Sequence, residues 1–72
     1  MTMTMTTFTR NRLGKILTTP DSTLLKVLGV REGKNFTLKV MQPFGGPVIV
    51  EIDNRKIAIS RAIADDIAVV EC

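Results

Sequence analysis

The sequence predicts a mostly β fold: a small, partly open antiparallel barrel of about five strands with one short helix. Three observations predict it. Apolar and polar residues alternate over several short runs, turn-forming residues separate these runs, and one segment alone has apolar residues at helical spacing between capping residues. The 72 residues are enough for one domain. We expect an aliphatic core, because the chain has three Phe and no Trp or Tyr.

The amino-terminal residues 1–9 alternate Met and Thr. This period of two is compatible with an edge strand, or with a soft binding surface made by the methionines. No turn or partner signal accompanies it, and chain ends are loose unless something ties them down. We therefore expect residues 1–9 to be a disordered tail and residues 10–72 to form the domain.

The first strand is predicted at residues 13–17 and ends before Pro20, which cannot donate to a strand ladder. Asp21 and Ser22 are both candidate N-caps for a helix of about two turns. Gly29 suits the left-handed position after such a helix, and Val30 suits the apolar position that folds back on it. Three leucines at helical spacing should close the barrel: Leu24, Leu25 and Leu28.

Two alternating runs, at residues 36–42 and 48–52, predict a hairpin. The alternation points Phe36, Leu38 and Val40 toward the core. The connection between the runs is rich in Pro and Gly: Pro43, Phe44, Gly45, Gly46 and Pro47. A type I turn from Gln42 to Gly45, with Pro43 in its second position, fits this sequence.

A second hairpin follows at Asn54, the non-glycine residue that best tolerates left-handed backbone angles. It leads into a strand over residues 56–61. A single helical turn should come next, held to the core by Ile63 and Ile67, and residues 68–71 should form the last strand. This order of elements is that of an SH3-like barrel, in which the first and last strands meet.

The charge pattern gives little support for binding nucleic acid. The net charge is +3, with acidic and basic residues mixed along the chain. The one basic cluster, Arg10, Arg12 and Lys15, is small for a surface that must neutralise several phosphates together. A plain solvated flank is the stronger interpretation.

The composition argues against an enzyme, a cofactor site and a metal site. The chain has no His, and its single Cys is Cys72. Nucleophilic catalysis therefore lacks its usual base, and zinc lacks its usual ligands. Asp65, Asp66 and Glu71 are the nearest approach to a carboxylate cluster, but adjacent acids on a helical turn point in different directions. One cysteine cannot form an intramolecular disulfide, so a reduced cytoplasmic setting is expected.

No apolar run is long enough to cross a membrane, and the first residues lack the basic start and apolar block of a signal peptide. Peptide binding in the manner of SH3 domains needs an aromatic groove, which three Phe cannot build. Stacking of single-stranded bases needs aromatic side chains too. What remains is a compact binding module with aliphatic, backbone or charged contacts.

Three blocks of sequence resemble the FeoA family, small cytosolic proteins of bacterial ferrous iron transport. The first block is Leu28-Gly29-Val30-Arg31-Glu32-Gly33, the second Pro43-Phe44-Gly45-Gly46-Pro47-Val48, and the third Arg61 through Ala64 with Ile67 and Val69. The likeness covers about residues 13–71. Glu32 stands where the family usually has proline, Asn54 where glycine is common, and the Thr/Met tail where a leucine-rich segment is usual.

The resemblance implies an SH3-like fold, also found at the carboxyl end of metalloregulators like the diphtheria toxin repressor. It implies a non-enzymatic accessory protein that docks on the cytosolic, GTP-hydrolysing part of the FeoB iron permease. The expected partner is therefore a protein, with no small-molecule substrate and no membrane insertion. The alternative is a regulatory domain of a metal-dependent transcription system, or a weak nucleic-acid binder using Arg10, Arg12 and Lys15.

Candidate contact residues lie in two places. One is the loop, with Pro43, Phe44, Gly45 and Gly46, where an exposed Phe44 would make the contact. The other is the helix surface around Leu24, Lys26 and Val27. In both places a purely structural role is the simpler interpretation, since a loop of Pro and Gly makes a good turn and helix leucines close a barrel.

Overall fold

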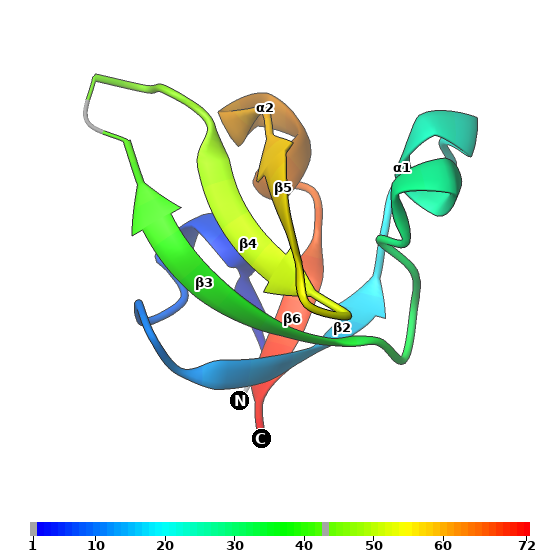
Figure 1. Ribbon diagram of the computed structural model, residues 1–72, viewed down its shortest axis with the longest axis horizontal. Coiled ribbons are helices and arrows are strands. Elements are labelled where there is room, and N and C mark those ends of the chain that lie inside the picture. Colours follow the sequence, from blue (N-terminus) through cyan, green and yellow to red (C-terminus); the bar gives the residue numbers. More distant parts are fainter. Residues whose placement is uncertain (1, 43) are drawn as a thin grey trace.

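A computed structural model describes residues 2–42 and 44–72 (Figure 1). The strands, in chain order, are β1 (Met3–Thr4), β2 (Leu13–Thr18), β3 (Asn35–Met41), β4 (Val48–Ile52), β5 (Arg55–Ile59) and β6 (Ala68–Glu71). The helices are the 3₁₀ turn η1 (Met5–Thr7), α1 (Thr23–Leu28) and α2 (Arg61–Ala64). Five of the strands and both α-helices fall where the sequence predicts them.

The strands form one antiparallel sheet in the order β1-β6-β2-β3-β4-β5. Ile16 lies opposite Val69, so β2 and β6 meet across the length of the chain as predicted. The sheet curls around its core (Figure 1) but does not close, because β1 and β5 are its two ends. The predicted mostly β, SH3-like fold is confirmed, with six strands instead of about five.

The amino-terminal segment corrects the expectation of a disordered tail. Met3 and Thr4 pair with Val69 and Ala68 of β6, and the Met5 N–H donates to the Ile67 carbonyl at 2.9 Å. The Met5 side chain is fully buried. The alternation of Met and Thr is thus that of a short edge strand, whose partner is supplied by the opposite end of the chain.

The middle of β3 departs from the predicted alternation. Leu38 lies opposite Val50, but Val40 lies opposite Ile49, so β3 contains one extra residue at this point. Such a β-bulge reverses the direction of the side chains that follow it. Val40, expected in the core, is 40% exposed, and Met41 packs against the core instead.

The second hairpin and the helical turn agree with the sequence. Asp53 and Asn54 have φ values of 53° and 65°, as a two-residue turn between twisted strands requires. The Ser60 hydroxyl accepts a bond from the Ile63 N–H at 3.3 Å and caps α2. Ile67 is fully buried behind this helix, as expected.

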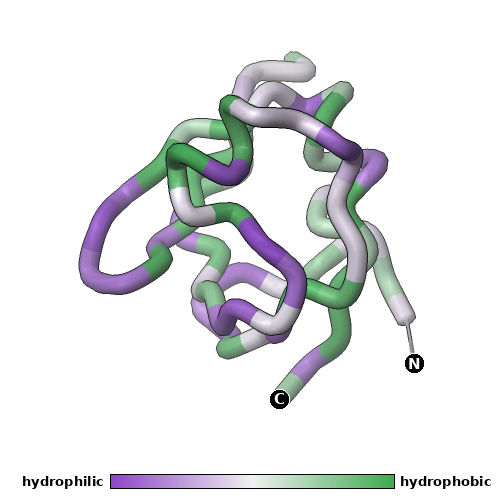
Figure 2. The backbone as a smooth tube through the Cα atoms, turned by 90° about the vertical axis from the view of Figure 1, so that its right-hand side faces the viewer, coloured by the Kyte–Doolittle hydropathy of each residue, from purple (hydrophilic) through white to green (hydrophobic). Residues whose placement is uncertain are grey.

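The core is almost wholly aliphatic. Figure 2 shows hydrophobic and hydrophilic residues alternating along the backbone, the pattern of a sheet with one face buried. The buried side chains are Met5, Phe8, Ile16, Leu25, Val30, Phe36, Leu38, Val48, Val50, Ile52, Ile57, Ile59, Ala64, Ile67 and Val69. Phe8 and Phe36 belong to this core, which leaves Phe44 as the one ring available at the surface.

Candidate docking surface

The 42–47 loop presents Phe44 to solvent without any shielding. Its relative exposure is 104%, and its φ of 60° is left-handed. A left-handed conformation costs a bulky residue roughly 1–2 kcal/mol. A type I turn from Gln42 to Gly45 would need a negative φ at Phe44, so that prediction is wrong. Pro43 lies outside the described residues.

The reversal instead uses two successive left-handed residues, since Gly45 has a φ of 76°. Glycine adopts this conformation without strain, whereas phenylalanine does not. Unfavourable backbone angles at an exposed apolar residue are typical of sites held for contact with another molecule. Of the predicted loop residues, Gly46 is half-buried and Phe44 and Gly45 are exposed.

The base of the loop is attached to the body of the domain. The Gln42 N–H donates to the Pro47 carbonyl at 3.4 Å, and the Arg61 guanidinium donates to the Gln42 carbonyl. Arg61 is the first residue of α2, so this bond joins the loop to that helix. The Arg61 Nε is buried and has no hydrogen-bond partner among the described residues. The base of the loop that carries Phe44 is therefore held to the body of the domain by hydrogen bonds.

Helix α1 is short, and its two ends are closed by the residues that the sequence indicates. The Ser22 hydroxyl accepts from the Leu25 N–H at 3.4 Å, which chooses Ser22 over Asp21 as the N-cap. At the other end Gly29 has a φ of 90°. Val30 N–H donates to the Leu25 carbonyl at 2.9 Å and Gly29 N–H to the Lys26 carbonyl at 3.1 Å, the pair of bonds of a Schellman motif.

The leucines of α1 divide between core and surface. Leu25 is 2% exposed, whereas Leu24 is 61% and Val27 71% exposed. Leu24 therefore does not help to close the barrel, contrary to the sequence prediction, because a helix this short turns only one narrow face inward. Leu24 and Val27, three residues apart, form an exposed apolar pair. Lys26 lies beside them and pairs with Asp21 at 3.6 Å.

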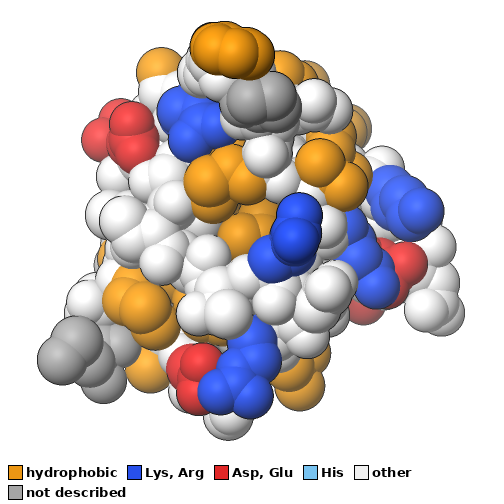
Figure 3. Space-filling view, turned by 90° about the vertical axis from the view of Figure 1, so that its left-hand side faces the viewer, with side chains coloured by type: hydrophobic (Ala, Val, Ile, Leu, Met, Phe, Trp, Pro, Cys, Tyr) orange, Lys and Arg blue, Asp and Glu red, His pale blue; other side chains and the backbone are white. Residues whose placement is uncertain are grey.

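Both predicted contact regions lie at one end of the molecule. In Figure 1 the 42–47 loop and α1 occupy opposite sides of the upper end, with α2 between them. Figure 3 looks onto the side of the loop and shows hydrophobic side chains gathered on the upper part of that face, interspersed with Lys and Arg. The structure thus brings the two regions to the same end without joining them into one patch. We call this the docking end.

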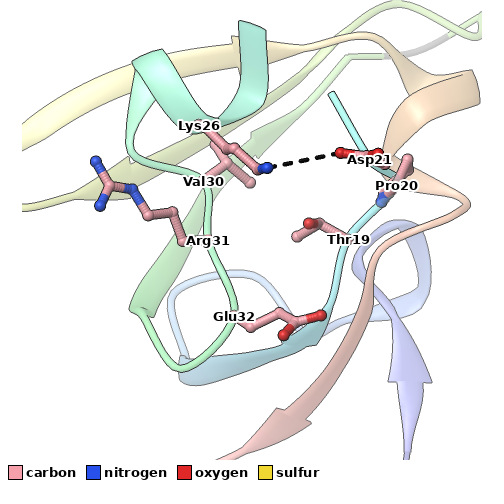
Figure 4. Close-up of a pocket in the computed structure, with 7 residues that line it drawn as sticks. All are labelled: Thr19, Pro20, Asp21, Lys26, Val30, Arg31 and Glu32. Carbon is pink, nitrogen blue, oxygen red and sulfur yellow. Dashed lines mark ion pairs between the residues drawn. The ribbon is translucent and has the colours of Figure 1, made fainter. Parts of the chain in front are cut away.

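A cleft of about 580 Å³ opens beside α1, where the segment after β2 faces the segment that leads into β3 (Figure 4). It is lined by Thr19, Pro20, Asp21, Lys26, Val30, Arg31 and Glu32. Only Lys26 was a predicted contact residue. The sequence does not reveal the cleft, because its two walls are separate turns and only the fold brings them together.

The predicted basic cluster is partly neutralised. Arg12 pairs with Glu71 at 3.4 Å, while Arg10 and Lys15 are exposed and have no ion pair among the described residues. The sequence cluster therefore does not form an isolated basic patch, which weakens the case for binding nucleic acid.

A second basic group surrounds Asp53. The Lys34 Nζ lies 2.8 Å from the Asp53 Oδ2. This hydrogen bond is the main cause that lowers the pKa of Asp53 below its ordinary value of 3.8, followed by the charge of Lys34; the charges of Arg55 and Arg31 lower it further. Lys34 is thus the cation that contacts this carboxylate, and the charges of Arg55 and Arg31 act on it from farther away, in the turn before β5.

No group of three or more His, Cys, Asp or Glu gathers in metal-binding geometry within residues 2–42 and 44–72. In the same ranges, no helix is long and apolar enough to cross a membrane.

Comparison with known proteins identifies relatives at the level of fold. No curated protein matches the sequence. A crystal structure of an iron uptake regulatory protein (FeoA) superimposes with a TM-score of 0.88 at 18% identity, over 100% of this chain and 99% of that one. A FeoA protein from Chlorobium tepidum gives 0.84 at 18% identity, over 96% of this chain and 70% of that one.

The same fold forms part of larger proteins. A manganese-dependent transcriptional repressor matches with a TM-score of 0.87 at 16% identity, over 99% of this chain but 42% of the repressor. In sequence, residues 11–71 match the FeoA domain family, which is most of the chain and includes the 42–47 loop, α1 and the cleft beside it. The chain belongs to the FeoA domain family.

Proposed function

We propose that this chain is a non-enzymatic accessory protein of ferrous iron transport that docks on the cytosolic, GTP-hydrolysing domain of a FeoB-type permease. Membership in the FeoA family implies the role in ferrous iron transport. Docking on the permease is the finer step, and the observation that carries it is Phe44, fully exposed in a left-handed conformation on a supported loop. A ring held in this way contributes little to the stability of the protein, but it contributes binding free energy when a partner buries it.

The rest of the docking end supports the same proposal. Leu24 and Val27 are exposed apolar residues that the core does not use. Hydrophobic anchors surrounded by polar residues are the usual composition of a protein interface. The cleft beside α1 adds side chains of both charges to the docking end. It is lined by the acidic residues Asp21 and Glu32 and the basic residues Lys26 and Arg31.

The test is a titration of the isotope-labelled chain with the cytosolic domain of the permease, with and without guanine nucleotide, followed by backbone amide shifts. We expect shifts in residues 42–47 and in α1. Phe44→Ala should reduce affinity at least tenfold, the usual effect of removing a central aromatic anchor. Its thermal midpoint should be unchanged, because the ring makes no buried contact.

Leu13→Ala is the matched control for Phe44→Ala. Leu13 is also an exposed apolar residue, 51% accessible, but its carbonyl accepts from the N–H of Cys72, at the other end of the molecule. The Leu13→Ala variant should therefore bind the permease domain with unchanged affinity. An absence of shifts at high concentration in both nucleotide states would overturn the proposal, as would equal affinity of the two variants.

A second candidate function is that of a regulatory domain in a metal-dependent transcription system. It is favoured by the fold likeness to the manganese-dependent repressor, which covers 42% of that protein. If the chain bound DNA itself, affinity should fall steeply with salt and fall again when Arg10 and Lys15 are changed to Gln. A flat binding isotherm at low salt would remove this candidate.

A further inference from the structure

Strand β5 is the open end of the sheet on the side of α1. It pairs with β4 through five residue pairs from Val48–Ile59 to Ile52–Arg55, and no other described strand pairs with it. An edge of this kind has backbone N–H and C=O groups that can pair with another chain. The edge strand β1 at the opposite end of the sheet has two residues, whereas β5 has five.

The register identifies the groups that face outward. Asp53 and Asn54 make a two-residue turn with both φ values positive, so the flanking pair, Ile52 and Arg55, exchanges hydrogen bonds. Hydrogen-bonded pairs then alternate along the hairpin. The N–H and C=O groups of Lys56 and Ala58 therefore point away from β4, toward the free edge.

The side chains leave this edge accessible. Lys56 and Ala58 are exposed, while Ile57 is 7% and Ile59 2% exposed on the core side. None of the turn, loop and cap hydrogen bonds of the described residues involves the backbone of Lys56 or Ala58. The methyl group of Ala58 leaves space beside the edge for the side chains of an added strand.

The charge at this edge indicates what kind of strand would bind. Lys56 has no ion pair among the described residues, and its cross-strand neighbour Glu51 pairs with Lys39 at 3.8 Å. Arg55 donates to the Leu28 carbonyl at 3.2 Å and has no ion pair among the described residues. Arg31 lies near enough to lower the pKa of Asp53. The beginning of β5 therefore lies in a region with more positive than negative charge, contributed by Arg31, Arg55 and Lys56.

We infer that β5 accepts an extended acidic segment of the partner protein as an additional strand, paired to the backbone of Lys56 and Ala58. This inference rests on the proposed docking function and specifies how the partner binds. Main-chain bonds give such a complex its affinity, and the facing cations select an acidic sequence. Pairing of β5 with a second copy of itself is disfavoured, because it would bring the cations of two edges together.

The test uses a soluble synthetic peptide of alternating Glu and Val, with a Lys and Val peptide as the counterpart of opposite charge. Addition of the acidic peptide to the isotope-labelled chain should shift the amides of Lys56 and Ala58 and slow their hydrogen exchange. The basic peptide should do neither. Shifts confined to other elements, or equal effects of both peptides, would overturn the inference.

Two variants make the test specific to this edge. Ala58→Pro removes an outward N–H without breaking the β4–β5 pairing and should reduce affinity at least tenfold. Lys56→Glu should reduce affinity for the acidic peptide about two- to fivefold, the scale of an exposed ion pair. Lys15→Glu is the matched control: the Lys15 side chain is exposed and has no ion pair in the described part of the chain, but Lys15 lies on β2 between β3 and β6. It should bind as the unmodified chain does.

The fold of each variant is checked by its amide spectrum, and Lys56→Glu keeps the test decisive if Ala58→Pro fails to fold. The same variants separate this inference from the proposed function. If the permease domain binds the unmodified chain, Ala58→Pro and Lys56→Glu equally well, the inference fails and docking stands. If it binds none of them while the acidic peptide still protects β5, docking on the permease fails and the edge site stands.

Discussion

The rings of Phe8 and Phe36 lie with their centroids 5.0 Å apart and tilted by 49°, over a glycine of β2. A Cβ added at Gly14 would lie 2.7 Å from a carbon of each ring. Phe8 precedes β2 and Phe36 belongs to β3, so the absence of a side chain at Gly14 lets both rings enter the core.

Gly14→Ala should therefore destabilise the domain by about 1–3 kcal/mol, the usual cost of overpacking a core. Both rings are buried and cannot move aside freely. Urea unfolding measures the effect as a lower midpoint. Combining Gly14→Ala with Phe8→Leu should cost less than the sum of the two changes, because the smaller side chain makes room. An unchanged midpoint in the single variant would show that the rings do not pack against this glycine.

Met5→Ala should cost about 2–5 kcal/mol, the range for truncating a buried large side chain. The Met5 side chain is fully buried, although it lies in a segment that the sequence predicts to be disordered. Met3→Ala is the control, since Met3 is only partly buried, and it should cost clearly less. Thermal unfolding compares the two. Equal, negligible effects would mean that the amino-terminal segment is a tail after all.

The bulge in β3 predicts opposite effects at neighbouring positions. Met41→Thr should destabilise the domain by about 1–3 kcal/mol, because it places a hydroxyl against the core. Val40→Thr, the same new residue one position earlier, should stay within about 0.5 kcal/mol, as exposed substitutions usually do. Chemical unfolding of both variants decides the register. The reverse order would restore the regular alternation and remove the bulge.

Asp53→Asn should reduce stability at neutral pH by an amount that disappears in acid. The pKa of Asp53 is lowered in the fold, chiefly by its hydrogen bond from Lys34, so its charged form is the stabilising one. That contribution is present above the ordinary pKa of 3.8 and is lost as the pH falls through the lower folded pKa. Asparagine tolerates the left-handed backbone at this position, so the change isolates the charge.

The measurement is the difference in unfolding midpoint between the unmodified chain and Asp53→Asn, followed from pH 7 down to about pH 2. The difference should also shrink in high salt, since the pair is exposed and salt screens it. A difference that is independent of both pH and salt would assign the effect to packing.

The elements that local chemistry specifies were predictable from the sequence. A capping hydroxyl, a glycine after the helix and an asparagine in a tight turn each act through bonds or backbone angles of their own neighbourhood. Ser22, Gly29 and Asn54 accordingly take the expected roles. The family resemblance drawn from three short blocks also holds, because residues 11–71 match the FeoA domain.

What the sequence could not predict depends on distant partners. Met5 is held in the core because the strand before it pairs with a strand from the other end of the chain, and alternation alone does not identify a partner. The bulge at residues 38–40 is invisible in β3 itself, since an extra residue is defined only against β4. The cleft and the free edge of β5 likewise exist only once the strands are placed in order.

Pairing of Met3 with Val69 has a consequence for larger architectures. It holds the amino and carboxyl ends side by side at the lower end of the molecule in Figure 1, opposite the 42–47 loop, α1 and α2. A domain fused to either terminus would leave the molecule from that end. The fused domain would therefore leave the 42–47 loop, α1 and α2 uncovered, so the same fold can form a separate protein or a module of a longer polypeptide.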